Sequence, residues 1–381
     1  MRRAQAVTGP RTGPAYDPAA LARRARAELR PEHYDFIAGG AGEERALREN
    51  ADAFARLALL PRVLRGGSPG SGTRVGVLGR EWPAPLFVSP TAFHRLAHPD
   101  GELATARAAA ATGTPLVTGV AATTAVADVV AAARARDPEA VVWFQLYLQP
   151  EHEVTAELVR RAERAGCSAL VVTVDSPVFG SRTRDLRNGF HDLPPGLAAE
   201  NMRDLPGAAP GATRDIAMWP AGWDDLRRLR DLTDLPLVLK GVLHPADARA
   251  AVEQGVDALL VSNHGGRQLD AAPAAVEALP AVAEAVAGRI PVLMDGGVRR
   301  GTDIALALAL GAVAAGVGRP VLWALATAGE DGVTELLSAL RADFAQVLAL
   351  CGGHRPADLT ADQVVARGLP HHRPKEGEPP W

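Results

Sequence analysis

The amino-acid sequence predicts an α/β fold, a (β/α)8 TIM barrel with an N-terminal helical extension and a long loop after the fourth strand. From residue 84 onward, short apolar runs rich in Val and Leu alternate with Ala-rich helical stretches. There are eight such runs, and eight parallel strands with intervening helices close a barrel. An open doubly wound sheet is the alternative, but no GxGxxG fingerprint follows the first run, which counts against it.

The predicted elements follow one another in the order that a barrel requires. The eight expected strands are Leu86–Ser89, Pro115–Thr118, Val141–Leu146, Ala169–Thr173, Leu237–Lys240, Ala258–Ser262, Pro291–Met294 and Ala314–Val317. The expected helices between them include residues 102–112, 153–165, 244–254, 274–287 and 301–310. Ahead of the barrel, we expect helices over residues 21–58 with a break at Gly39–Gly42, then a flexible loop over 66–72. The Gly- and Pro-rich residues 183–222 form the predicted long loop, and such loops are usually functional or mobile.

Composition predicts one large domain and excludes several functions. With 47% hydrophobic residues, the 381-residue chain can bury a large core, and we expect a single domain over residues 21–365. A disordered N-terminus (1–20) and a polar tail (366–381) are expected to flank it. A net charge of −3 gives no reason to expect nucleic acid or an anionic membrane as partner. No apolar stretch is long enough to span a bilayer. Two cysteines make no disulfide framework, so we expect a reduced, cytoplasmic protein.

Polar and ionisable residues, together with small residues, follow nearly every predicted strand. In a barrel the carboxyl ends of the strands meet at one rim, where the chemistry of such enzymes takes place. Taken alone, Lys240 could be a solvated strand end, His264 a structural histidine and Asp175 a helix cap. Their shared position at one rim favours a functional site over these separate interpretations. The residues at this rim are Pro90, Thr91, Ala92, Gln145, Tyr147, Thr173, Asp175, Arg182, Lys240, Ser262, His264, Arg267, Asp295, Gly296, Gly297, Arg299, Gly318 and Arg319.

Glycines after the last two strands indicate a phosphate site. Gly296, Gly297 and Gly318 follow strands seven and eight, where barrels commonly bind phosphate through backbone N–H groups. Arg299 and Arg319 would add charge-assisted donors. We therefore predict a phosphate-bearing cofactor. The histidines are scattered and make no ligand cluster, so no metal is expected.

Five motifs make the chain similar to a known family. They are SNHGGRQLD (262–270), TVDSPVFGSR (173–182), LKGV (239–242), DGGVRRGTD (295–303) and GRP (318–320). In their order and spacing along the chain, these motifs resemble those of the FMN-dependent alpha-hydroxy acid oxidases and dehydrogenases, which include glycolate, lactate and mandelate enzymes. The resemblance runs from about residue 20 to residue 365, and mandelate-type oxidases, especially 4-hydroxymandelate oxidases, are the most similar members. It implies FMN as cofactor.

The resemblance implies roles for the catalytic and substrate-binding residues. His264 matches the active-site base, and Asp175 matches the carboxylate that pairs with it. Arg182 and Arg267 match two arginines that hold the substrate carboxylate, a task that suits the planar guanidinium. Tyr147 matches a tyrosine that contacts the substrate oxygen.

The resemblance also implies a set of flavin contacts. Lys240 matches a lysine beside the edge of the flavin where reduction places negative charge, and a fixed cation stabilises that charge. The other residues that match the cofactor site are Pro90, Thr91, Ala92, Gln145, Thr173, Ser262, Asp295, Gly296, Gly297, Arg299, Gly318 and Arg319.

The sequence departs from the family where substrate size is decided. Phe36 stands where glycolate and lactate enzymes carry a tyrosine, and Ala121 stands near a large residue of glycolate oxidase. Gly119 stands where a serine pair usually lies beside the flavin. We therefore expect a pocket for an aryl 2-hydroxy acid such as (S)-mandelate or 4-hydroxymandelate.

The remaining expectations concern the electron acceptor and the oligomeric state. We expect oxygen as electron acceptor, giving hydrogen peroxide. A lactate or 2-hydroxy acid dehydrogenase that reduces a quinone or a carrier, and a biosynthetic oxidase of a larger intermediate, are the alternatives. The resemblance implies a homo-oligomer, a tetramer or octamer.

Overall fold

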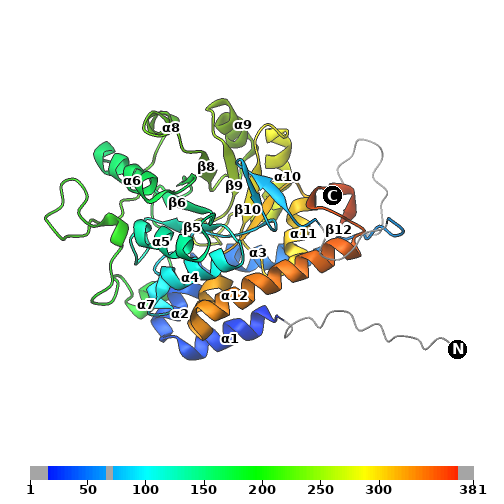
Figure 1. Cartoon of the computed structure of the whole chain (residues 1–381), viewed down its shortest axis with the longest axis horizontal. Helices are drawn as coiled ribbons and strands as arrows, with labels where there is room; N and C mark the ends of the chain where they lie inside the picture. Colours follow the sequence, from blue (N-terminus) through cyan, green and yellow to red (C-terminus); the bar gives the residue numbers. More distant parts are fainter. Residues whose placement is uncertain (1–15, 66–71, 368–381) are drawn as a thin grey trace.

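A closed barrel of eight parallel strands forms the centre of the molecule, as the sequence predicts. The structure is a computed structural model and describes residues 16–65 and 72–367. The strands close in the order β10-β11-β4-β5-β6-β7-β8-β9 (Figure 1). Their bounds are β4 Leu86–Val88, β5 Leu116–Gly119, β6 Val142–Leu146, β7 Leu170–Thr173, β8 Leu237–Lys240, β9 Ala258–Val261, β10 Val292–Asp295 and β11 Ala314–Val317. Each strand lies within about a residue of its prediction, so the open-sheet alternative is excluded.

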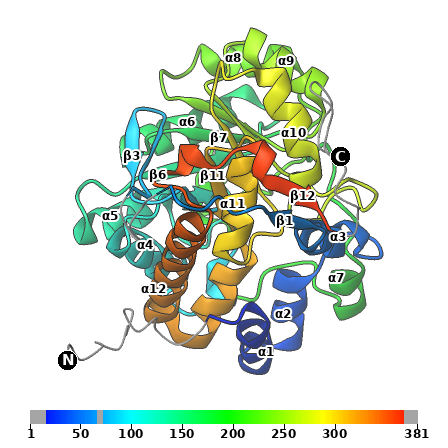
Figure 2. The same ribbon diagram turned by 90° about the vertical axis from the view of Figure 1, so that its right-hand side faces the viewer.

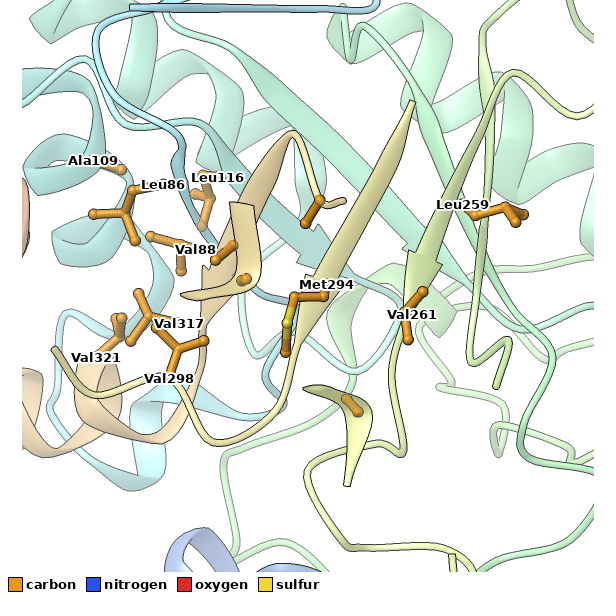
Figure 3. Packing of buried hydrophobic residues seen from close by; sticks show 14 of the residues in the cluster. Leu86, Val88, Ala109, Leu116, Leu259, Val261, Met294, Val298, Val317 and Val321 are labelled. Carbon is orange, nitrogen blue, oxygen red and sulfur yellow. The ribbon is translucent and has the colours of Figure 1, made fainter. Parts of the chain in front are cut away.

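Side chains alternate along each strand between the helices outside and the barrel interior. Leu86 and Leu116 belong to the outer hydrophobic cluster and lie beside Ala109 of α4 in Figure 3. Phe87 and Val117, one residue further along, belong to a second cluster inside the barrel. The same alternation turns the last residues of several strands inward, above this apolar interior. Those residues are Gln145, Thr173, Lys240 and Asp295.

A short hairpin closes the amino-terminal end of the barrel. Strands β2 (Val75–Val77) and β3 (Arg80–Trp82) pair antiparallel, and Val77 and Trp82 join the interior cluster. The Trp82 ring lies 6.2 Å from that of Phe87 and 5.4 Å from that of Trp143, measured between centroids. Side chains therefore fill the amino-terminal end of the barrel interior, and the open end is the rim at the carboxyl ends of the strands.

Helices surround the barrel and bury its outer face (Figure 1). They are α4 Gly101–Ala111, α5 Val126–Arg136, α6 His152–Ala165, α8 Trp223–Arg230, α9 Pro245–Glu253, α10 Ala275–Val286, α11 Gly301–Ala309 and α12 Arg319–Leu350. The longest of them, α12, bends at Ala328 and Gly329, where the backbone leaves helical geometry. The five predicted helices agree with this set to within a residue or two.

Three helices precede the barrel: α1 (Pro18–Glu28), α2 (Pro31–Ala38) and α3 (Arg45–Ala55). The break at Gly39–Gly42 agrees with the sequence, but a second break at Leu29 and Arg30 was not predicted. Its reason is Pro31, since a residue before proline favours extended backbone, and Arg30 has ψ 141°. Residues 57 and 58, expected to be helical, instead start β1 (Leu57–Leu59), which pairs with β12 (Val364–Ala366) (Figure 2).

The long connection after β7 contains more structure than predicted. A short helix, α7 (Thr183–Asn188), and a 3-10 turn, η2 (Glu200–Met202), interrupt residues 183–222, and α7 packs against α2. The proposed disordered N-terminus is wrong for residues 18–20, which begin α1, while 1–15 lie outside the described residues. Ala366, assigned to the polar tail, ends β12. Residues 368–381 and the predicted flexible loop at 66–71 also lie outside the described part.

Candidate functional site

A cavity of about 960 Å³ opens at the carboxyl rim of the barrel. This volume lies at the upper end of the range for sites that hold small molecules or cofactors. All candidate residues line it except Asp175 and Ser262, each of which hydrogen-bonds to His264. The lining candidates are Phe36, Pro90, Thr91, Ala92, Gln145, Tyr147, Thr173, Arg182, Lys240, His264, Arg267, Asp295, Gly296, Gly297, Arg299, Gly318 and Arg319.

His264 is held by two short contacts in the loop after β9. Its Nδ1 lies 2.9 Å from Asp175 Oδ1, and its backbone N–H donates to Ser262 Oγ over 3.0 Å. The backbone at His264 is left-handed, with φ +58°, a conformation uncommon outside glycine. Because the ionised Asp175 accepts from Nδ1–H, the other ring nitrogen carries the lone pair and can accept a proton. The pair is therefore arranged as a base with a fixed orientation.

The charges around His264 keep the base and its partner in complementary states. Burial lowers the pKa of His264, and Lys240 adds to this, while Asp175 acts in the opposite direction. Burial alone would raise the pKa of Asp175, but His264 and Lys240 outweigh it and hold that pKa well below its usual range. Burial, reinforced by Asp175, raises the pKa of Tyr147 to about 12, so its hydroxyl stays protonated. The site thus combines a neutral imidazole with a permanent carboxylate.

Two arginines stack on one aromatic ring at the mouth of the cavity. The guanidinium carbons of Arg267 and Arg182 lie 5.0 and 5.6 Å from the centroid of the Phe36 ring. Arg267 also donates to the carbonyls of Phe36 and Gly39, at 2.7 and 3.0 Å. Burial lowers the pKa of Arg267, and Arg182 lowers it further, because two cations lie close together. Asp185 lies 3.6 Å from Arg182 and offsets one of the two positive charges. The remaining positive charge favours an anion beside the guanidinium groups.

A second cationic group lies beside the predicted phosphate glycines. Arg319 donates to the carbonyls of Ile37, Gly265 and Gly39, which fixes its side chain. Burial lowers its pKa to about 9, and the charge of Arg299 contributes. Two buried arginines whose charges act on each other are electrostatically suited to phosphate.

The backbone at Gly296 and Gly297, in the turn after β10, has no room for a side chain at Gly297. Gly297 has φ +84°, and a side-chain carbon there would lie 2.0 Å from the carbonyl oxygen of Asn50. Gly296 has φ +100°, so both residues can be only glycine without strain. Both glycines line the cavity, so this turn presents backbone without a side chain there, as the phosphate prediction requires.

The flavin fits the donors and acceptors that the cavity leaves available. Gln145 Nε2 donates to Thr173 Oγ1 over 3.0 Å, and Lys240, only 3% exposed, ends the neighbouring strand. Within residues 16–65 and 72–367, buried Ser89 Oγ and Arg182 Nε have no hydrogen-bond partner, yet both residues line the cavity. Unpaired buried polar atoms at a cavity wall are expected where a polar ligand binds. A cofactor with a polar ring edge would supply a partner for the Ser89 hydroxyl, and an anionic substrate would supply one for Arg182 Nε–H.

The connection after β7 contributes cavity residues that sequence reasoning did not identify. Six of them are apolar or aromatic: Phe179, Leu186, Phe190, Leu193, Ile216 and Met218. The same connection also places polar side chains at the cavity, namely Asp185, His191, Asp192, Thr213, Arg214 and Asp215. Phe190 packs on Phe36, with ring centroids 5.3 Å apart. The only available signal was that large apolar residues occur singly in a Gly- and Pro-rich stretch, which does not show what they face. The connection thus forms a mixed wall, whose apolar part lies around Phe36, where Phe190 and Phe93 pack on its ring.

Fold and site together define a TIM-barrel enzyme with a phosphate-binding cofactor site and an anion-binding pocket beside a histidine base. The sequence profile of the FMN-dependent dehydrogenase family matches residues 25–366, and the chain belongs to this family. The enzyme is therefore FMN-dependent, as the sequence motifs indicated.

Individual relatives support this assignment over most of the chain. Human 2-hydroxyacid oxidase 1 is 43% identical, over 87% of this chain and 91% of its own length. An L-lactate oxidase from Nostoc sp. is 45% identical, over 88% of this chain and 94% of its own length. A crystal structure of mandelate oxidase with (S)-2-phenylpropionate superimposes with a TM-score of 0.82 at 43% identity. The match covers 90% of this chain and 96% of the mandelate oxidase chain. In the described part of the chain, no helix is long and apolar enough to cross a membrane.

Gly297→Ala is expected to destabilise the protein and to reduce its FMN content. Strained left-handed backbone costs about 1–3 kcal/mol for a residue with a side chain, and the clash with the Asn50 carbonyl adds to this. Unfolding temperature and flavin absorbance of the purified protein measure both effects. Gly76→Ala is the matched control, because no atom lies within 4 Å of the added carbon. Normal FMN content in Gly297→Ala would remove this turn from the cofactor site.

Proposed function

We propose that the protein oxidises an aryl-bearing L-2-hydroxy acid to the 2-oxo acid, with oxygen as acceptor and hydrogen peroxide as product. The observation that carries this proposal is the juxtaposition of the His264–Asp175 pair with Arg182 and Arg267 beside the apolar part of the cavity wall. The reaction removes two electrons and two protons from the substrate, and oxygen takes up all four. FMN, when bound, carries the two electrons between substrate and oxygen.

The residues of the chain have separable tasks in this proposal. Arg182 and Arg267 bind the carboxylate and so fix which face of the alpha carbon is presented. His264 takes the proton, and Asp175 stabilises the imidazolium that results. Tyr147, whose hydroxyl stays protonated, donates a hydrogen bond to the substrate oxygen. Lys240 supplies fixed positive charge next to the flavin site.

The preference for an aryl side chain follows from Phe36 and the wall around it. Phe36 offers no hydroxyl to the carboxylate, and one lost hydrogen bond to a charged group costs about 1.5–3 kcal/mol. Burying a phenyl group recovers a similar amount at about 25 cal/mol per Å², and glycolate has no such group. Tyr34 could have supplied the missing hydroxyl. It instead packs against Arg26, 5.7 Å from its ring, and is absent from the cavity lining.

L-Mandelate is expected to be oxidised with a higher kcat/KM than L-lactate or glycolate. A panel of 2-hydroxy acids, scored by flavin bleaching without oxygen, measures this directly. Phe36→Tyr should narrow the gap by helping the small acids more, because it restores a donor at the carboxylate. A panel in which L-lactate is the better substrate would contradict the aryl preference and leave the family assignment intact.

The electron acceptor, the cellular location and the assembly each have a separate test. Peroxide formed under air, compared with dye reduction without air, separates an oxidase from a dehydrogenase. The relatives named above are oxidases, which favours oxygen. The cytoplasmic location and the homo-oligomer expected from the sequence remain predictions, for which cell fractionation and light scattering are the measurements.

A further inference from the structure

A buried histidine lies behind the cavity wall and has no part in the function proposed above. His94 is 3% exposed and begins η1 (His94–Leu96), the 3-10 turn after β4. Its Nε2 lies 2.7 Å from Thr91 Oγ1, and its Nδ1 lies 2.9 Å from Thr105 Oγ1 on α4. Thr91 lines the cavity, whereas His94 and Thr105 do not. The ring is therefore one layer removed from the cofactor site.

The hydrogen-bond partners assign the direction of each bond. The Thr105 hydroxyl donates to the carbonyl of Gly101, so it accepts from Nδ1–H of His94. Nε2 then carries the lone pair and accepts from the Thr91 hydroxyl. Burial lowers the pKa of His94 and favours this neutral form, although Glu102 opposes it. Glu102 itself is occupied by four donors, the N–H groups of His94 and Thr123 and the hydroxyls of Thr123 and Thr124.

This bond determines what Thr91 presents to the cavity. A threonine places its hydroxyl and its methyl in different staggered positions, so fixing one fixes the other. With the hydroxyl on His94, the methyl faces β11, since Cγ2 would lie 3.4 Å from a side-chain carbon at Gly318. Gly318 belongs to the predicted phosphate and ribityl side of the site. Thr91 therefore offers this side an apolar surface.

We propose that His94 is a positioning residue for the FMN site: by accepting the Thr91 hydroxyl it keeps that hydroxyl out of the cavity and holds the methyl toward Gly318. Without His94, the hydroxyl loses its partner and rotates toward the cavity in search of one, because an unpaired buried hydroxyl is costly. The methyl then leaves its place against Gly318, so the surface against which the cofactor lies changes shape. The proposal requires FMN binding but neither the aryl substrate nor oxygen as acceptor.

The test measures the affinity of the holoenzyme for FMN. The holoenzyme is diluted, and the fluorescence of the released flavin gives the Kd. His94→Leu should raise the FMN Kd about 5- to 10-fold, the value of one hydrogen bond. Adding Thr91→Val to His94→Leu removes the stray hydroxyl and should recover most of the lost affinity. Thr112→Val, which removes a hydroxyl at the far end of α4 without contact to His94, is the control; it should leave the Kd unchanged.

Two results would overturn the proposal. If His94→Leu lowers only the unfolding temperature, the histidine is merely part of the core. If the double variant binds FMN no better than His94→Leu, the effect does not act through Thr91. Should His94→Leu fail to fold, His94→Gln replaces it, since its amide oxygen can accept from Thr91. Its Kd should stay within about twofold of the native value, and a tenfold rise would refute the role of the acceptor.

Discussion

Replacing His264 with Ala is expected to slow reduction of the flavin by substrate about 100- to 10,000-fold, the usual contribution of a general base. Among the predicted catalytic residues no other supplies a neutral base, because Asp175 is bound to the His264 ring and Tyr147 keeps its proton. Stopped-flow absorbance without oxygen measures the rate. Flavin content should remain normal, since the His264 side chain is not among the proposed cofactor contacts.

The pH dependence gives an independent check on His264. The neutral imidazole is the active form, and its pKa is lowered by burial, with Lys240 contributing. Activity of the native enzyme should therefore fall only when the pH drops below the ordinary range of histidine, about 6.5. His264→Ala should lose this acidic limb. His152→Ala, at an exposed position on α6, is the control. It should keep both the native rate of flavin reduction and the loss of activity at acidic pH. Near-native reduction by His264→Ala would exclude the histidine as the base.

Arg267→Lys is expected to lower kcat/KM for the hydroxy acid about 100-fold or more, although the charge is kept. Each charge-assisted hydrogen bond contributes about 1.5–3 kcal/mol, and a tenfold change corresponds to about 1.4 kcal/mol. A lysine cannot reach the Phe36 and Gly39 carbonyls and also present a planar fork to the cavity. Steady-state kinetics on the acid and on its methyl ester measure the effect.

The ester separates carboxylate binding from general damage to the site. Arg267→Lys should affect the ester far less than the acid, because the ester carries no charge. Arg74→Lys, on the exposed hairpin at the opposite end of the barrel, should change neither. An equal loss on acid and ester would show that Arg267 acts through the loop it holds and not through the substrate.

The barrel was predictable because its signal is local and repeated. Each strand is a short apolar run, most of them rich in Val and Leu, and in several of them the last inward residue is polar, as in Gln145, Lys240 and Asp295. The order of the strands then brings distant residues to one rim without any knowledge of their contacts. This is why His264 and Asp175, 89 positions apart, could be expected in one site.

The parts that were missed depend on contacts between segments far apart in the sequence. Phe36 was identified as a substrate residue, but nothing local shows that its ring would carry two guanidinium groups. Asn50 pairs with Asn263 through two buried hydrogen bonds and so ties α3 to the catalytic loop. The helix α7 has only six residues, too few for a hydrophobic period. Pro31 is a local signal for the helix boundary at Arg30, because the residue before a proline favours extended backbone.

The position of the N-terminal helices has a consequence for synthesis on the ribosome. The helices α1 to α3 emerge first, but their partners come last: Arg319 binds the Ile37 carbonyl across 282 positions, and Leu57 pairs with Ala366. Contacts of such long sequence separation form slowly. The nascent chain must therefore hold its first segment undocked until nearly the whole barrel has been translated. Chaperone engagement is expected during this interval, since unpaired apolar helix faces are prone to aggregation.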